Sequence, residues 1–396
     1  MEKKSILIFG AGKIGRSFIG QLFGLSGYEV VFSDIDVELV ALLNLKKSYN
    51  IVIKGDKEER ITIFNVRAIN GNNEEAVTEE VKNTSIVAVS VGKNALLKIV
   101  PILAKGLIKR FQNHEHGPVD IIIAENMRSA NEVIYKELKN NLPLDFPLDD
   151  YVGLVETSIG KMVPIMTADE INKDPLAVFA EPYNQLILDK KGFRNEVPNV
   201  MGLAPKENIR AWVDRKAFIH NLGHATAAYY GFFKYPGSAY LYEVLEDKHV
   251  LEFTRRVMLQ SAAILLKIYP EDFTPKDLSD HIEDLLFRFR NRALKDTLFR
   301  VGQDIPRKLG PDDRFMGIIR LGIPLKMPYD KILEAMSYAF FFKATDENGR
   351  RHEQDIVFEK LLSQGIDYTL QKVCGIDPVF DQELAEKVKS SINVKR

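Results

Sequence analysis

The sequence predicts a two-domain protein, in which an α/β amino-terminal domain precedes an all-α carboxyl-terminal domain. In the first half, short apolar segments alternate with helix-like patterns, as in a parallel sheet covered by helices. A glycine-rich turn joins the first of these segments to a helix pattern. Beyond about residue 206 the apolar residues recur at helical spacing.

Length and composition indicate an ordinary globular protein. The 396 residues suffice for two cores, and 45% of them are hydrophobic and 28% charged. A net charge of −1 with interspersed signs indicates neither a nucleic-acid-binding nor an anionic-membrane-binding protein. The single cysteine, Cys374, excludes an internal disulfide and a cysteine-built zinc site. With no signal-peptide pattern and no apolar run near the ~20 residues that span a bilayer, we expect a cytoplasmic protein with a small-molecule substrate.

Apolar runs bounded by turn residues predict the strands of the first domain. The segment 189–206 has few periodic apolar residues and is rich in glycine, proline, asparagine and charge, so we place the domain boundary there. The first domain is then 1–195 and the second 196–396. The predicted strands are 5–9, 29–33, 51–53, 60–64, 85–90, 119–124, 151–155, 177–179 and 186–188.

The glycine-rich turn follows the first predicted strand and opens a helix pattern, which is the context of a dinucleotide-binding fingerprint. Gly10 permits the tight turn, Gly12 lets the backbone approach a pyrophosphate, and Gly15 lets helix and strand pack closely. The helix amino terminus then offers N–H groups to the phosphates. A turn that binds nothing is the alternative. The predicted cofactor-binding residues here are Gly10, Ala11, Gly12, Lys13, Ile14 and Gly15.

Asp34 ends the second predicted strand, 19 residues after Gly15, where an acid accepts hydrogen bonds from the adenosine ribose hydroxyls. No Arg or Lys follows it, and Asp36 adds a second acid that would repel a 2′-phosphate. The sequence therefore favours NAD over NADP as the cofactor.

Two later strands of the sheet end in residues suited to the same crevice. Val91 and Gly92 follow the strand 85–90, and Asn126 follows the strand 119–124. The carboxyl ends of such strands line the cofactor crevice, so we expect these three residues to bind the cofactor and Asn126 to meet the substrate as well. A turn or capping role for Asn126 is equally compatible with its position.

One predicted helix, 207–232, carries an amine, an amide and two imidazoles. Successive helical residues advance by about 100°, so Lys216, His220 and His224 share a face and Asn221 lies near His224. Such a face could hold a hydroxyl group and take its proton, or could simply pack. Further helices are predicted over 240–268, 274–301, 329–344, 353–373 and 379–392. A shorter helix is predicted to open at Gly310, and Gly375 is predicted to end a late helix after Cys374.

A basic segment, residues 300–309 with Arg314, concentrates cations around turn residues. It suits either a clamp for a substrate phosphate or carboxylate, or salt bridges to nearby acids, and the residues alone favour the salt bridges. Its cations are Arg300, Arg307, Lys308 and Arg314.

These motifs resemble those of the polyol-specific long-chain dehydrogenases, over about residues 5–322. The pattern Lys216-x4-Asn221-x2-His224 after a complete dinucleotide fingerprint is specific to that family. The other matching segments are 9–20 with Asp34, 48–49, 104–110, 125–127, 172–176, 215–216, 300–302, 307–309 and 313–314.

The resemblance implies a Rossmann-type first domain and a role for each matching site residue. Lys216 is expected to be the general acid/base, Asn126 and Asn221 to stabilise the alkoxide, and His224 to position the substrate oxygen. The four cations of the basic segment become candidates for the substrate phosphate. Since His220 departs from the family pattern, a packing role is expected for it. The family is metal-independent.

The resemblance therefore implies an NAD-dependent oxidoreductase, monomeric or homodimeric, that interconverts mannitol 1-phosphate and fructose 6-phosphate. A reductase of sugar acids such as fructuronate or tagaturonate, and a dehydrogenase of unphosphorylated polyols, remain alternatives in the same class. An NAD(H)-sensing binding protein is the alternative outside it, although a sensor has no need of Lys216, Asn221 and His224 together.

Overall fold

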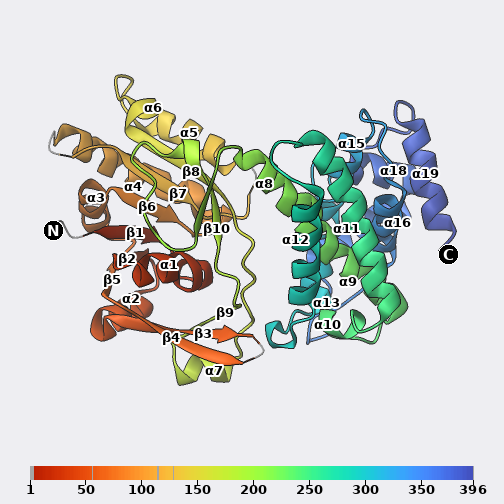
Figure 1. Cartoon of the computed structure of the whole chain (residues 1–396), viewed down its shortest axis with the longest axis horizontal. Coiled ribbons are helices and arrows are strands. Elements are labelled where there is room, and N and C mark those ends of the chain that lie inside the picture. The colour runs from red at the N-terminus through yellow and green to blue at the C-terminus, as the bar shows by residue number, and fades with distance from the viewer. Residues whose placement is uncertain (1–3, 56, 114–115, 128, 396) are drawn as a thin grey trace. The chain divides into compact units, whose positions relative to one another are not determined.

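The computed structural model describes residues 4–55, 57–113, 116–127 and 129–395 (Figure 1). The chain divides into two compact units, one ending at Val213 and the other beginning at Asp214. The first is α/β and the second is helical, which confirms the predicted fold class. In the part of the chain that the structure describes, no helix is long and apolar enough to cross a membrane.

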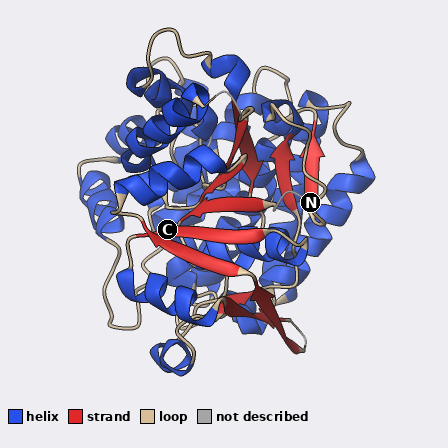
Figure 2. Cartoon of the chain, turned by 90° about the vertical axis from the view of Figure 1, so that its left-hand side faces the viewer, coloured by secondary structure: helices blue, strands red, loops and turns tan. Residues whose placement is uncertain are grey.

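The first unit is built on an eight-stranded sheet in the order β11-β10-β8-β7-β6-β1-β2-β5 (strands red in Figure 2). The six strands from β8 to β5 are parallel, β10 is antiparallel to β8, and β11 is parallel to β10. The strands are β1 Ser5–Phe9, β2 Glu29–Asp34, β5 Val66–Asn70, β6 Ile86–Val89, β7 Val119–Ile123, β8 Val152–Ser158, β10 Leu186–Asp189 and β11 Leu203–Lys206.

Strand β1 lies at the topological switch point of this sheet. Phe9, its last residue, pairs with Ser33 of β2 on one side and with Val89 of β6 on the other. The chain proceeds outward from β1 in both directions, and in open α/β sheets ligands bind beyond the carboxyl ends of the strands at that point.

A second, three-stranded sheet of order β4-β3-β9 contains the added strands predicted around residues 51–64. Its members are β3 Ser48–Lys54, β4 Glu58–Phe64 and β9 Val178–Ala180. The strands β5 and β11 were not predicted. β5 carries Arg67 and ends in Asn70, so it lacks a continuous apolar run, and β11 contains Pro205, which is tolerated because β11 is an edge strand.

Alternate residues of β1 enter the two apolar cores of the first unit. Ile6 and Ile8 face one core, with Phe18, whereas Leu7 and Phe9 face the other. Figure 1 shows α1 on one side of these strands and α3, α4 and α5 on the other. The helical segments are η1 Gly15–Ile19, α1 Gly20–Leu25, α2 Val37–Lys46, α3 Glu74–Asn83, α4 Lys93–Gln112, α5 Ala130–Asn141, α6 Leu148–Tyr151, α7 Ala168–Lys173 and η2 Lys190–Gly192.

The predicted continuous helix 207–232 is wrong in one respect, since its middle is wound differently. The segment consists of α8 Ile209–Arg215, the π-helix η3 Lys216–Asn221 and α9 Leu222–Lys234. A π-helix closes its hydrogen bonds from i to i+5, which widens the turn at the lysine.

The predicted helix 274–301 is also wrong, because it breaks after Phe289. The side chain of Asn291 caps a short 3-10 turn, Lys295 has a φ of 51°, and Thr297 caps a new helix. The region is α12 Pro275–Phe289, η4 Arg292–Leu294 and α13 Leu298–Gly302. Capping residues thus outweighed a periodic apolar pattern.

The remaining helices of the second unit follow the predicted ranges with breaks. Asp247 caps α11 and divides the predicted helix 240–268. The helix expected to open at Gly310 begins at Met316, and α14 precedes it. These segments are α10 Leu241–Val244, α11 Lys248–Ile268, α14 Ile305–Lys308, α15 Met316–Gly322, α16 Asp330–Tyr338, η5 Ala339–Phe341, α17 Glu353–Ser363, α18 Ile366–Thr369, η6 Leu370–Cys374 and α19 Gln382–Asn393.

Candidate active site

The glycine-rich turn has the geometry of a dinucleotide-binding loop. Gly10 has a φ of +91°, and a Cβ there would lie 2.5 Å from the carbonyl oxygen of Ser90. A Cβ at Gly15 would overlap the carbonyl oxygen of Gly10. A Cβ at Gly12, in contrast, would meet nothing within 4 Å. Two glycines therefore serve packing within the protein, and the third leaves an open face beside the loop.

Asp34 is held against this loop at the end of β2. Its Oδ2 accepts a hydrogen bond of 2.7 Å from the backbone N–H of Ala11, and its Oδ1 accepts one of 3.0 Å from Asp36 N–H. The side chain of Asp36 instead caps α2 by accepting from Glu38 and Leu39. Of the two predicted acids, Asp34 is thus the one fixed at the loop.

Arg16 holds the glycine-rich loop in place through hydrogen bonds, a role that the sequence did not indicate. Its buried guanidinium donates to the carbonyl of Ala11 through Nε at 2.7 Å and to that of Leu176 at 2.7 Å. The contact with Leu176 joins residues 160 positions apart, so no local pattern could reveal it.

The predicted residues at the ends of β6 and β7 come together. Val89 pairs with Ile123 at the ends of these neighbouring strands, and Gly92 and Asn126 each follow three residues later. The buried Glu125 accepts a hydrogen bond of 2.8 Å from Gly92 N–H, and burial raises the pKa of its carboxyl group. Asn126 is exposed, whereas Glu125, next to it in the sequence, holds the two strand ends together.

In the second unit, Lys216 begins the π-helix η3 and Asn221 ends it. A π-turn is wider than an α-turn, so Asn221 lies closer to the face of Lys216 than it would in a regular α-helix, while His220 stays on that face. Burial lowers the pKa of Lys216 from 10.5 to about 8, and the positive charge of Arg314 acts in the same direction. The lysine is therefore partly unprotonated near neutral pH.

The two histidines after Lys216 have different surroundings. His224 stacks on Phe289, with ring centroids 4.6 Å apart and an interplanar angle of 14°, while His220 is buried and lies 5.5 Å from the same ring. Burial and the cations Arg300 and Lys308, with others, lower the pKa of His224 well below its ordinary value. Its ring is therefore neutral at physiological pH.

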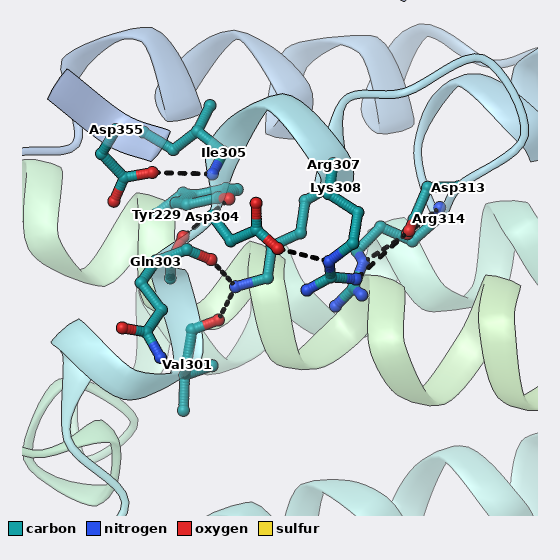
Figure 3. Close-up of polar contacts among 11 residues, drawn as sticks. Tyr229, Val301, Gln303, Asp304, Ile305, Arg307, Lys308, Asp313, Arg314 and Asp355 are labelled. Atoms are coloured by element: carbon teal, nitrogen blue, oxygen red, sulfur yellow. Dashed lines mark hydrogen bonds and ion pairs between the residues drawn. The ribbon is translucent and has the colours of Figure 1, made fainter. Parts of the chain in front are cut away.

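Two cations of the basic segment, Arg300 and Lys308, already interact with groups inside the protein. Arg300 makes an ion pair with Asp296, which is 5% exposed. The buried Lys308 donates to the carbonyls of Val301, at 2.5 Å, and Gln303 (Figure 3). Burial, with Arg314 nearby, holds the pKa of Lys308 well below its ordinary value.

The other two cations share one carboxylate, that of Asp313 (Figure 3). Arg307 is 53% exposed and pairs with Asp304 as well as Asp313. Arg314 is buried; its Nε lies 2.8 Å from Asp313, and it donates to the backbone carbonyl of Asn221 at 3.2 Å. This last bond ties the basic segment to the helix that carries Lys216.

Each unit thus gathers the predicted residues that it contains. The first unit places the loop 10–15, Asp34, Val91–Gly92 and Asn126 at neighbouring strand ends. In the second unit, contacts link the stretch 216–224 to Arg300, through Asp296, and to Arg314. Asp296 was not predicted, since nothing in the sequence distinguishes it from a surface acid, and no role was predicted for Asp313, although it lies in a segment that matches the family.

Models of one protein family match both units. The mannitol dehydrogenase Rossmann domain matches residues 4–202, and the mannitol dehydrogenase C-terminal domain matches residues 208–392.

Proteins similar over the full length include mannitol-1-phosphate 5-dehydrogenases. That of Streptococcus mutans is 30% identical over 392 residues, covering 98% of this chain and 99% of the relative. That of Buchnera aphidicola is 30% identical over 381 residues, covering 96% and 95%.

Two solved structures share the fold at low sequence identity. Pseudomonas fluorescens mannitol 2-dehydrogenase, in a ternary complex with NAD and D-mannitol, has a TM-score of 0.76 at 16% identity and covers 99% of this chain and 91% of its own. A substrate-free D-sorbitol dehydrogenase has a TM-score of 0.80 at 17% identity and covers 99% and 93%.

Proposed function

Since this chain belongs to the mannitol dehydrogenase family, whose oxidoreductases act on CH–OH groups, we propose that it interconverts mannitol 1-phosphate and fructose 6-phosphate with NAD. The observation that carries the proposal is the half-buried amine of Lys216 at the start of η3, whose pKa of about 8 suits proton transfer at neutral pH. The two relatives named above support the phosphorylated substrate.

The residues of the first unit fit NAD. The open face at Gly12 leaves room for a pyrophosphate, and η1 begins three residues later, at Gly15. Asp34 is fixed beside the loop, and each of its oxygens keeps a lone pair for a ribose hydroxyl. Val91, Gly92 and Asn126 extend the site along the strand ends. When bound, NAD accepts a hydride from the carbinol carbon, and NADH returns it.

Lys216 then handles the proton. In polyol oxidation its neutral amine takes the hydroxyl proton as the C–H bond breaks, and in ketone reduction its ammonium returns that proton. Asn221, at the other end of the π-helix, donates an amide N–H to the developing alkoxide, and Asn126 is proposed to supply a second donor. Donors of this kind contribute about 3 kcal/mol each. His224 holds a substrate oxygen next to the reacting carbon.

Among the four cations, Arg307 suits the substrate phosphate best. It is half exposed, and its partners are carboxylates that a phosphate can replace as acceptors of its N–H groups. Arg314 and Arg300 are proposed as further contacts of the substrate phosphate, whose negative charge they would also attract. Lys308 contributes charge from its buried position, because its ammonium already donates to two carbonyls.

The proposal is tested by NADH oxidation with the purified chain against fructose 6-phosphate, fructose, fructuronate and tagaturonate. We expect the highest kcat/KM with fructose 6-phosphate. A sugar acid is the second candidate, because the arginines of the basic segment would also pair with a carboxylate. A preference for fructuronate, tagaturonate or free fructose would contradict the phosphorylated substrate.

A further inference from the structure

Two buried polar atoms of the second unit face each other. Nε2 of His224 and Oδ2 of Asp296 lie 3.4 Å apart, and neither forms a hydrogen bond within the ranges that the structure describes. A buried polar group without a partner costs about 1–3 kcal/mol. A movement of a few tenths of an ångström would bring this pair to hydrogen-bond distance and satisfy both atoms.

The backbone and a cation fix the position of the Asp296 carboxylate. Its carbonyl accepts a hydrogen bond of 2.8 Å from Leu241 N–H, and the next residue, Thr297, forms a β-bridge with Tyr240. The other carboxylate oxygen, Oδ1, is paired with Arg300. One carboxylate oxygen of Asp296 therefore pairs with Arg300 of the basic segment, and the other faces His224.

We propose that Asp296 is a positioning residue that holds His224 as the tautomer protonated on Nε2. A neutral imidazole has one N–H, and a carboxylate can only accept, so the proton must lie on Nε2 if the pair is bonded. Nδ1 then carries a lone pair and can accept a hydrogen bond from a substrate hydroxyl but cannot donate one. The stacking of His224 on Phe289 fixes the plane of the ring in which that lone pair lies.

If the chain has the proposed function, this tautomer of His224 affects which substrates the enzyme prefers. With Nδ1 as acceptor, His224 favours a substrate with a hydroxyl group next to the reacting carbon over one with a carbonyl or ether there. It also revises the role of Arg300, which acts on His224 through Asp296 besides any contact with a phosphate.

The first test is the tautomer of His224 in the ¹⁵N-labelled full chain, read from imidazole two-bond ¹H–¹⁵N correlations. The His224→Gln variant assigns its signals among those of the seven histidines. We expect protonation on Nε2 in the wild-type protein. Protonation on Nδ1, or an equal mixture, would overturn the proposal without any variant.

The second test is Asp296→Asn, whose amide can either accept from Nε2 or donate to it. We expect the tautomer preference to be lost and kcat/KM to fall at least about tenfold, as for other residues that orient a functional imidazole. The pH midpoint of kcat should stay near that of the wild-type protein, because Arg314, not Asp296, is the charge that lowers the pKa of Lys216. An unchanged tautomer and kcat/KM in a folded variant would contradict the positioning role.

Asp355→Asn is the matched control. Asp355 is equally buried and accepts one backbone hydrogen bond, of 2.8 Å from Ile305 N–H, so its replacement tests the general cost of altering a buried acid. It should leave the His224 signals unchanged; if it shifts the tautomer as Asp296→Asn does, the effect is structural and the proposal fails. The signals require no turnover, so inactivity toward sugar phosphates would overturn the proposed function and leave this inference standing.

Discussion

The π-helices η1 of the first unit and η3 of the second each lie among the predicted site residues of their own unit, and these two groups of residues differ in how they are built. η1 follows the glycine-rich loop, and its site is made of backbone: N–H groups, close packing and one fixed carboxylate. η3 carries Lys216 and Asn221, and its site is made of side chains whose properties depend on burial and distant charges. A backbone site is specified by local sequence, whereas a side-chain site is specified by the surrounding fold.

This difference predicts different responses to substitution. Changes at the loop 10–15 and Asp34 should alter cofactor affinity and leave proton transfer intact, whereas changes around η3 should alter the chemical step and leave cofactor affinity intact.

The largest effect is expected from Lys216→Ala. Loss of the general acid/base should lower kcat at least about a hundredfold. NADH affinity, measured by fluorescence titration, should barely change. A primary alkylamine added to the assay should restore part of the rate, since it can replace the missing amine.

Lys216→Arg is the control for charge at this position. A guanidinium keeps the positive charge but cannot lose its proton near neutral pH, so this variant should be as slow as Lys216→Ala. A folded Lys216→Arg enzyme with a near-normal rate would remove proton transfer from the role of Lys216.

The same difference explains how much of the molecule was predictable from sequence. The loop 10–15 and Asp34 were found because each glycine has a local reason that spacing records. The strand β5 and the break at Lys295 were missed, since polar residues and caps there conflict with the apolar period. Arg16 and Asp296 were missed because their contacts join distant segments.

The choice between His220 and Asn221 as the partner of Lys216 also could not be made from local sequence. A regular α-helix places His220 over Lys216, and only the family pattern favoured Asn221. The π-helix widens this turn and so moves Asn221 toward the face of the lysine, but His220 stays on that face as well. Local sequence contains no signal for a π-turn that we could recognise.

The next effect in size is expected from Asp34→Ser, which tests the backbone-built site. Loss of charge-assisted hydrogen bonds to the ribose, worth about 1.5–3 kcal/mol, should weaken NAD binding by roughly 10–100-fold. NADP binding should change much less, because the carboxylate also repels a 2′-phosphate. Isothermal titration with both cofactors measures this.

Asp36→Ser is its control, because serine can also cap α2 and Asp36 does not hold the loop. It should leave NAD affinity within a few-fold of the wild-type value. Equal losses for NAD and NADP in Asp34→Ser would show that Asp34 does not contact the ribose.

A smaller effect, about tenfold per pH unit, is expected from titration of Lys216. Polyol oxidation needs the free amine, so its kcat should rise with pH below about 8 and level off above it. Ketone reduction needs the ammonium, so its kcat should be level below pH 8 and fall above it. Opposite limbs with a shared midpoint are the expected observation, and parallel limbs would contradict a single acid/base.

The free energy of unfolding should also depend on pH through the titration of Lys216. The pKa of Lys216 is about 8 when folded and 10.5 in its ordinary range, so between these values the unfolded chain binds more protons. The contribution of Lys216 to the free energy of unfolding should therefore rise with pH from about 8 to 10.5. A comparison of wild-type and Lys216→Met proteins in urea titrations isolates that contribution.

The smallest effect is expected from Arg307→Ala, because the exposed guanidinium already shares carboxylate partners and is screened by solvent. We expect KM for fructose 6-phosphate to rise by about three- to tenfold, KM for free fructose to stay nearly constant, and kcat to change little. Arg292→Ala is the matched control, since Arg292 is 73% exposed and pairs with Glu246. If both variants, or both substrates, respond alike, Arg307 has a structural role in ordering Asp304 and Asp313, and the phosphate contact must lie elsewhere in the basic segment.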